Sequence, residues 1–457
     1  MHLYTKSTNT TDATKNTLLG HPKGLFVLFL TEMWERFSFY GMRAILVLFL
    51  IDRVHGGFGW SENTALSLYG IYLMMAYLLA IPGGFLADHY TGQIAAVLLG
   101  AGLQCVGYIL LILKYESLLM PALGLIALGT GLLKPNISTM VGGLYEKRDP
   151  RRDSGFTIFY MGISAGMMLA SFVVGTVGEV YGWEYGFGLA VVGNLLSIAT
   201  FWWGKKHLAT PTSKPRTGAR KRGTKNLMLT GEEKDRLLLV CIALIAACIF
   251  YIALEQSGGL MTLYAENYTD RYVYDRELPA SIFTGLTPAF IILLGPVVAL
   301  IWMRLAKRSQ RINAIFKMGV ANIIIGLGVL CMVGASWQKQ ASPTGQSPLY
   351  WLVGAYFIYA IGDLCLSPVI LSFLTRVAPR RLKAVMTGTY FATLGIASFL
   401  AGKLGEQSGT LGELTIFALV TAMTILLGIP FIIFNRPLMV LAHGSADVDE
   451  DDEWDSQ

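Results

Sequence analysis

Long apolar stretches separated by short polar connections dominate the chain, and twelve of them are long enough to cross a bilayer as a helix. They are residues 25–51, 64–88, 93–113, 117–141, 155–180, 185–204, 237–265, 280–304, 311–336, 349–376, 384–405 and 414–435. The pattern predicts an all-α polytopic membrane protein whose twelve transmembrane helices form two six-helix bundles.

The polar stretches between and beside the apolar ones set the predicted division of the chain. The divisions are an N-terminal tail at 1–24, a first bundle at 25–204, a basic linker at 205–236, a second bundle at 237–436 and an acidic tail at 437–457. The linker is rich in Gly, Pro, Ser and Thr, which is typical of a flexible connection. Its Lys and Arg residues predict contact with anionic membrane lipid.

The composition supports a membrane protein and excludes a nucleic-acid-binding one. Hydrophobic residues make up 54% of the 457 residues and charged residues only 14%, whereas a soluble chain of this length carries more charge. The 50 glycines suit close packing of helices in lipid. The net charge of +6 comes from Lys and Arg in the connections, so it predicts membrane siding and no nucleic-acid partner.

Lysine and arginine concentrate in alternate connections, and this predicts the orientation of the chain. The residues are Lys147, Arg148, Arg151, Arg152, Arg304, Lys307, Arg308, Arg380, Arg381 and Lys383. By the positive-inside rule these connections and both termini face the cytoplasm. We expect a multi-pass protein of the cytoplasmic (inner) membrane, and no cleavable signal peptide, because the first apolar stretch is too long for one.

The first apolar stretch contains four ionisable residues at membrane depth: Glu32, Glu35, Arg36 and Arg43. At about 100° per residue they share one helix face with Tyr40. Each such charge costs roughly 2.5–3.5 kcal/mol on insertion scales, so it is seldom without a function. This face predicts a polar stripe along a water-filled cavity; a self-neutralising ion network that only joins helices is the alternative.

Other motifs do not indicate metal binding or enzymatic chemistry. The five cysteines show no metal-ligand spacing. Residues Gly162–Gly166 match G-x-S-x-G, the only motif that suggests a membrane enzyme. That motif acts on a strand-to-helix elbow, and here it lies within an apolar stretch, where small residues serve helix packing. We expect no enzyme and no metal site.

Two sequence features resemble the major facilitator superfamily. The six-plus-six layout with a long central loop is the superfamily's plan, in which two halves rock about a central site. Residues 83–92, GGFLADHYTG, resemble its signature, with His89 at a position where Arg is usual.

A second, more specific resemblance runs from the first to the tenth predicted segment. Residues 32–43, EMWERFSFYGMR, resemble the ExxERFxYYG signature of the proton-dependent oligopeptide transporter family. Further stretches that resemble the family are GLLKPNISTMVGGLY at 131–145, YEKRDPRRDSGFTIFY at 145–160, GWEYGF at 182–187, ALEQSG at 253–258 and GDLCLSPV at 362–369. The resemblance implies a proton-coupled symporter that imports di- or tripeptides, or peptide-like compounds, by alternating access.

The depth of four ionisable residues predicts two ion pairs between the bundles. Arg43 lies roughly 7 Å past the midpoint of the first segment toward the outside, at 1.5 Å per residue. Glu255 lies at a similar depth in the seventh, while Lys134 and Asp363 lie nearer the cytoplasm or the midplane. An outer Arg43–Glu255 gate and an inner Lys134–Asp363 gate follow, and the resemblance implies the same pairs.

The predicted roles combine these depths with the resemblance. The proton-coupling residues are Glu32, Glu35, Arg36 and Glu255. The substrate-binding residues are Arg43, Tyr40, Tyr77, Lys134, Ser164, Thr287, Asp363 and Tyr390. The proton is the coupling ion, no other cofactor is expected, and a monomer in membrane lipid is expected.

The chain departs from the family pattern at several of these positions, which leaves the substrate open. Ser164 and Thr287 stand where Asn is usual, Asp363 where Glu is usual, Tyr390 where Trp is common and Phe39 where Tyr is usual. The alternative is a transporter of a modified peptide, an amino-acid conjugate or a siderophore-like compound. A nutrient sensor that does not transport is a further alternative.

Overall fold

The computed structural model describes residues 17–145, 149, 151–208, 230–308, 313–379 and 382–443. In the first half of the chain the helices are α2 (Lys23–Ile51), α3 (Glu62–Leu78), α4 (Ala80–Leu86), η2 (Ala87–Thr91), α5 (Gln93–Ile112), α6 (Glu116–Gly143), α7 (Arg152–Leu169), η3 (Ala170–Gly175), α8 (Thr176–Tyr181), α9 (Trp183–Gly204) and η4 (Lys205–His207). In the second half they are α10 (Gly231–Glu255), η5 (Gln256–Gly258), α11 (Leu260–Tyr268), η6 (Ala280–Gly285), α12 (Leu286–Arg308), α13 (Ala314–Ala341), α14 (Leu349–Val377), α15 (Lys383–Glu406), α16 (Ser408–Leu411), α17 (Glu413–Ile433) and α18 (Asn435–Val440).

Two-residue strands form three small pairs at the ends of the helices. β1 (Thr17–Leu18) pairs antiparallel with β2 (His21–Pro22), and β4 (Tyr272–Val273) with β5 (Arg276–Glu277), while β3 (Thr269–Asp270) runs parallel to β6 (Ser347–Pro348). The end that carries β3 to β6 is called the hairpin end. The opposite end, where α2 begins, is called the basic end because Arg151, Lys205 and Lys206 lie there.

Eleven helical segments of the described chain are long and apolar enough to cross a membrane. α2 is a further helix of 29 residues, and it carries the four charged residues of the first apolar stretch. The predicted all-α architecture with twelve spanning helices is therefore confirmed for the part of the chain that the structure describes.

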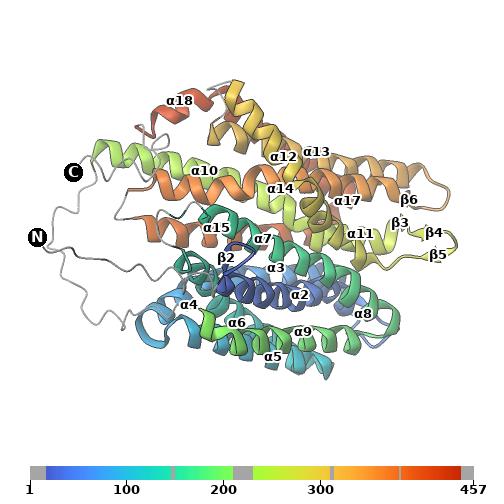
Figure 1. Ribbon diagram of the computed structural model, residues 1–457. Helices are drawn as coiled ribbons and strands as arrows, with labels where there is room; N and C mark the ends of the chain where they lie inside the picture. The colour runs from blue at the N-terminus through green and yellow to red at the C-terminus, as the bar shows by residue number, and fades with distance from the viewer. Residues whose placement is uncertain are drawn as a thin grey trace, which may run out of the picture.

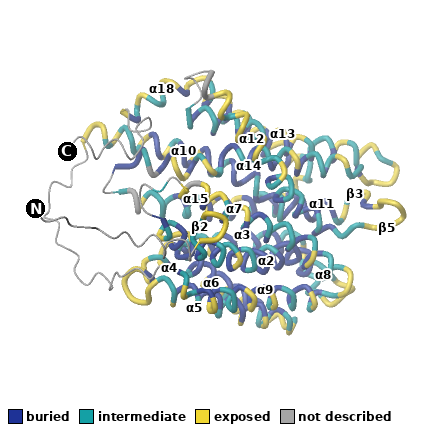
Figure 2. The backbone as a smooth tube through the Cα atoms, viewed as in Figure 1, coloured by how far each residue is buried: buried dark blue, intermediate teal, exposed yellow. Residues whose placement is uncertain are grey.

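The helices form two bundles that meet along one boundary, called the seam. In Figure 1, α2 to α9 lie together in blue to green, and the helices from α10 onward lie beside them in yellow-green to red. At the seam α3 packs against α15, α7 against α12, and η3 against η6. Most of α2 is buried, so its charged face lies inside the protein and not against lipid (Figure 2).

Capping residues explain where two helices begin, and the observed boundaries differ from the predicted ones. Thr230 and Glu233 form a reciprocal capping box, so α10 begins at Gly231 and includes the last six residues of the predicted linker. The Asn313 side chain caps α13 by accepting a hydrogen bond from the backbone N–H of Phe316. Of the predicted tails and linker, residues 1–16, 209–229 and 444–457 lie outside the described residues, while Thr17–Pro22 and α18 have regular structure.

Candidate functional site

A charged cluster lies on the inward face of α2, as its sequence pattern predicts. The Nε atom of Arg36 lies 3.1 Å from Oε1 of Glu32 and 2.5 Å from Oε2 of Glu35. All three side chains are at most 3% exposed. One cation shared by two carboxylates leaves a net negative charge in a buried place, which is costly unless other groups stabilise it.

Gln104 on α5 supplies part of that stabilisation, and the sequence offered no signal for it. Its side-chain amide donates to Oε1 of Glu35 at 2.8 Å and to the Thr130 hydroxyl at 2.9 Å. Gly129 leaves the space that Gln104 occupies, because a Cβ there would lie 2.6 Å from the Gln104 Cγ. From the sequence alone, a glutamine in an apolar helix cannot be assigned hydrogen-bond partners, because these lie on neighbouring helices.

The Arg43 side chain joins the two bundles. Its Nη2 atom lies 2.6 Å from Oε2 of Glu255, the last residue of α10. Its Nε and Nη2 atoms also donate to the Tyr69 hydroxyl on α3, at 3.0 and 2.7 Å. The guanidinium lies 5.1 Å from the Tyr40 ring centroid. The predicted partners meet, with Tyr69 as an additional partner that sequence reasoning missed.

The end of α10 at Glu255 allows the two bundles to come close enough for the Arg43–Glu255 contact. α10 ends there, and the short turn η5 separates it from α11. A Cβ on Gly258 in that turn would lie 2.3 Å from the Tyr69 hydroxyl and 3.3 Å from Nη2 of Arg43. The glycine of the ALEQSG stretch is therefore required for contact between the bundles. Discontinuous helices of this kind form ion and substrate sites in membrane transporters.

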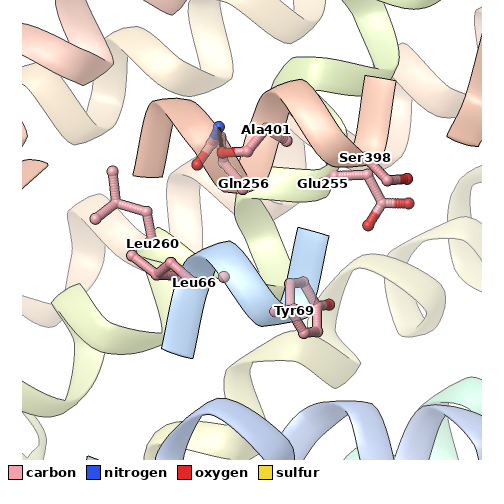
Figure 3. Close-up of a pocket in the computed structure, with 9 residues that line it drawn as sticks. Leu66, Tyr69, Glu255, Gln256, Leu260, Ser398 and Ala401 are labelled. Atoms are coloured by element: carbon pink, nitrogen blue, oxygen red, sulfur yellow. Dashed lines mark hydrogen bonds between the residues drawn. The ribbon is translucent and has the colours of Figure 1, made fainter. Parts of the chain in front are cut away.

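A small cavity of about 10 Å³ adjoins Glu255, which is room for one water molecule. Figure 3 shows its lining side chains, among them Tyr69 from α3, Gln256 after α10, and Ser398 and Ala401 from α15. The Gln256 amide donates to the Ala401 carbonyl at 3.2 Å. Glu255 thus lies beside a small cavity on the seam that has both polar and apolar lining residues.

Lys134 and Asp363 do not form the predicted ion pair in this structure. The Lys134 ammonium lies 4.4 Å from the Tyr77 ring centroid and 6.0 Å from that of Phe391, across the seam on α15. The Asp363 carboxylate instead accepts a hydrogen bond from Ser367, one helical turn further along α14. The short aspartate side chain follows its own helix, so its charge is not directed across the seam.

The other predicted substrate residues differ in their hydrogen-bond partners. The Tyr390 hydroxyl bonds to that of Tyr251 at 3.0 Å, and Tyr251 also contacts Ser367 at 3.1 Å. Thr287 donates to the Tyr356 carbonyl at 3.5 Å, a weak contact. The buried Ser164 hydroxyl has no hydrogen-bond partner among the described residues. It lies inside α7, so the G-x-S-x-G match is helical and has no nucleophile elbow.

At the hairpin end, outside the spanning segments, Asp52 organises the loop after α2. Burial of the carboxyl raises its pKa, but hydrogen bonds from the Trp183 indole and from the backbone of Val54, His55 and Gly57 outweigh it. The pKa of Asp52 is therefore below its usual value of 3.8. This network fixes the end of α2 to α9 within one bundle.

Comparisons with known proteins give one family. The profile described as "POT family" matches residues 94–230 and 219–410. The chain is 35% identical to the uncharacterized transporter YclF of Bacillus subtilis over 90% of this chain and 92% of that one. It is 33% identical to the peptide transporter YePEPT of Yersinia enterocolitica, over 87% and 90%. A crystal structure of a mutant peptide transporter POT in complex with alafosfalin matches with a TM-score of 0.83 at 33% identity, over 93% of this chain and 96% of that one.

Proposed function

The chain belongs to the POT family of the major facilitator fold, and we propose that it imports di- or tripeptides, or peptide-like compounds, together with protons by alternating access. The Arg43–Glu255 ion pair carries this proposal, because it closes the seam with a group that a proton can neutralise. A lone buried charge is strongly unfavourable, so protonation of Glu255 would release Arg43 and favour separation of the bundles there.

We place the basic end in the cytoplasm and both termini with it. The Lys and Arg residues of the connections at that end support this orientation. With this siding the hairpin end faces outward, and the Arg43–Glu255 pair is the outer gate. The membrane would be the cytoplasmic membrane, with lipid around a monomer.

The described conformation fits one state of the cycle. Arg43 is paired with Glu255, whereas Lys134 and Asp363 are apart. In alternating access the two sides of the central site are never open at the same time. The contacts support assigning this conformation to a state that is closed at the proposed outer gate and not at the proposed inner one, with Lys134 available to bind a substrate carboxylate.

The proposed proton path uses two clusters. Glu32, Glu35 and Arg36 lie in the N-terminal bundle, and Glu255 lies in the C-terminal one. The substrate's ends would meet Lys134 and Asp363, with Arg43, Tyr40, Tyr77, Ser164, Thr287 and Tyr390 around them. No cofactor besides the proton is needed for this scheme.

Uptake of dialanine into proteoliposomes under an imposed inward proton gradient tests the proposal. We expect uptake that an uncoupler abolishes, and Glu255→Gln to lose it while retaining counterflow, because the amide imitates the protonated carboxyl. Glu413→Gln is the matched control, since Glu413 pairs with Lys339 at 3.1 Å inside one bundle. Uptake that persists without a gradient in both variants would contradict proton coupling.

A modified peptide or amino-acid conjugate is the second candidate substrate class. Asp363 is turned toward Ser367, and the hydroxyls of Ser164 and Thr287 replace longer amides, which leaves more space around the substrate amine. Inhibition of dialanine uptake by amine-substituted dipeptides at lower concentration than by dialanine itself would favour this class. The reverse order of inhibition would favour ordinary peptides.

A further inference from the structure

Glu179 on α8 makes a contact between the bundles that neither the charged cluster nor the Arg43 pair uses. Its Oε1 atom accepts a hydrogen bond from the backbone N–H of Ala280 at 2.8 Å, and its Oε2 atom accepts one from Ser281 at 2.8 Å. Glu179 belongs to the N-terminal bundle, and both donors belong to η6 of the C-terminal bundle. One carboxylate thus holds two adjacent amides across the seam.

The sequence around η6 makes these two amides available. Pro279 precedes the turn with φ −57° and ψ 140°, so the N–H groups that follow it have no acceptor within the turn. Hydrogen bonds to an ionised acceptor are about twice as strong as neutral ones. The carboxylate therefore satisfies two donors that would otherwise need water or another acceptor.

Small residues bring η3 close enough for this contact. A Cβ on Gly175 would lie 2.5 Å from the Ser281 hydroxyl, and one on Gly285 would lie 2.8 Å from the Ser171 Cβ. Beside them the Ser171 and Thr284 hydroxyls bond across the seam at 2.8 Å. Close packing and hydrogen bonds therefore join η3 and η6 at several positions and not only at Glu179.

The charge of Glu179 has no cation to hold it. Among the described residues it forms no ion pair, and Glu266 on α11, a carboxylate that repels it, is itself paired with Arg271 at 3.0 Å. Arg43 and Glu255 differ in this respect, because a substrate or a proton can replace either partner. Backbone amides carry no net charge and do not titrate, and a substrate is not needed to bring them to Glu179. The Glu179 contact is therefore present whenever the hairpin end is closed, with or without substrate.

We propose that Glu179 is a gating residue that stabilises the closed hairpin end in the absence of substrate, and so sets the resting conformation of the transporter. The proposal rests on alternating access as the proposed function. A contact shifts an equilibrium between conformations only if it differs between them. The Glu179 contact crosses the seam, so it is lost when η3 and η6 separate, whereas contacts inside one bundle persist.

Distance measurement between spin labels tests this in the full chain in lipid nanodiscs without substrate. Labels on cysteines at Tyr115 and Trp337, both exposed at the hairpin end of different bundles, report its opening in a background without the five native cysteines. We expect Glu179→Gln to raise the open-to-closed ratio about tenfold, because the amide keeps one acceptor oxygen and loses the charge. Glu179→Asp should cause a smaller rise.

Glu184→Gln is the matched control. Glu184 is also a glutamate at the hairpin end of the N-terminal bundle, but it pairs with Lys114 of the same bundle at 2.8 Å. We expect its distance distribution to match that of the unsubstituted chain. An unchanged distribution in both Glu179 variants, or an equal shift in the control, would overturn the proposal. If Glu179→Gln does not fold, the Glu179→Asp distribution decides.

The readout needs no transported solute, which separates this proposal from the proposed function. A chain that takes up no peptide but opens in Glu179→Gln would contradict the peptide assignment and support the gating role. A chain that takes up peptide but shows no shift in either variant would support the transport assignment and contradict the gating role.

Discussion

The two ends of the seam differ in how the bundles are held together. At the hairpin end Arg43 pairs with Glu255, Glu179 holds two amides, Ser171 bonds to Thr284, and the Asn267 side chain donates to Glu62 at 2.9 Å. Toward the basic end the residues expected to pair, Lys134 and Asp363, face other partners. Four directional contacts therefore join the bundles at the hairpin end, whereas the expected Lys134–Asp363 pair toward the basic end is not formed.

The chemistry of the two ends also differs. The hairpin end combines a buried ion pair with carboxylate-to-amide and hydroxyl contacts, and glycines allow the backbones to approach. Toward the basic end an ammonium lies over aromatic rings, an arrangement worth about 0.5–2 kcal/mol and easily exchanged for a carboxylate. A transporter needs one set of contacts that holds without substrate and another that substrate can replace. This difference can be tested by substitutions on both sides.

The largest effect is expected for Arg43→Ala. It leaves Glu255 buried without its cation, at a cost of about 3–5 kcal/mol to the closed hairpin end. We expect a chain that is open at that end and lacks gradient-driven uptake. Labelling of a cysteine at Tyr40 by a membrane-impermeant maleimide added from outside should rise sharply. Labelling equal to that of the unsubstituted chain would contradict the gate.

Lys134→Ala should have the next largest effect, and it should depend on the ligand. Loss of a buried partner for a substrate carboxylate costs about 2 kcal/mol or more, which is at least thirtyfold in affinity. Dipeptides with a free carboxylate should weaken by this factor, and their C-terminal amides by much less. Binding curves for both ligands measure the difference. Equal weakening of the two ligands would remove Lys134 from the carboxylate site.

Alanine substitutions at two glycines of α15 compare the packing of the two ends of the seam. A Cβ on Gly402 would lie 2.7 Å from the Gly70 Cα and 2.8 Å from the Leu66 carbonyl, all backbone atoms that cannot move aside. A Cβ on Gly388, toward the basic end, would meet only the Ile81 side chain at 3.9 Å. Gly402→Ala should cost the closed hairpin end about 1–3 kcal/mol, whereas Gly388→Ala should have no measurable effect.

The spin-label distances at the hairpin end also serve for these two variants. A broad or longer distribution is expected for Gly402→Ala alone. If Gly388→Ala produced the same change, the packing of the seam would not differ between its ends, and the comparison would fail.

Asp363→Glu should act at the released side with a smaller effect. The added methylene lengthens the side chain beyond its present contact with Ser367, and the fit of one methylene is worth about 1–3 kcal/mol. We expect a shift of preference toward ordinary dipeptides over amine-substituted ones, increased further by Thr287→Asn. Competition curves with both ligand classes measure this shift. An unchanged preference in the double variant would exclude these positions as determinants of the substrate.

The smallest effect on opening is expected for Asp52→Asn, because Asp52 acts within one bundle. A lowered pKa in the folded protein means that its stabilisation is present above the usual value of 3.8 and is lost as the pH falls below it. The substitution should lower the free energy of unfolding at pH 7 by about 1 kcal/mol, which lowers the melting temperature, and this difference should shrink as the pH falls below 3.8. The spin-label distances should stay unchanged. A change in those distances would show that contacts within one bundle also bias the seam.

The sequence predicted one of the two expected ion pairs correctly and the other wrongly for this conformation. Depth along the predicted helices brought Arg43 and Glu255 together correctly, because helix rise converts residue number into height in the membrane. The same argument applied to Lys134 and Asp363 gave two residues that do not meet here. Depth specifies which residues are able to meet across the seam, and the relative position of the bundles determines which of them do.

By itself the sequence determined the membrane helices, the division into two bundles and the buried charges on α2, since each follows from local hydropathy and helical period. The tertiary structure alone decided the contacts of Tyr69, Gln104, Ser367 and Glu179. For Glu179 the physical reason is general: its partners are backbone amides, which every residue except proline has. No pattern of side chains can reveal such a contact until the two bundles are packed against each other.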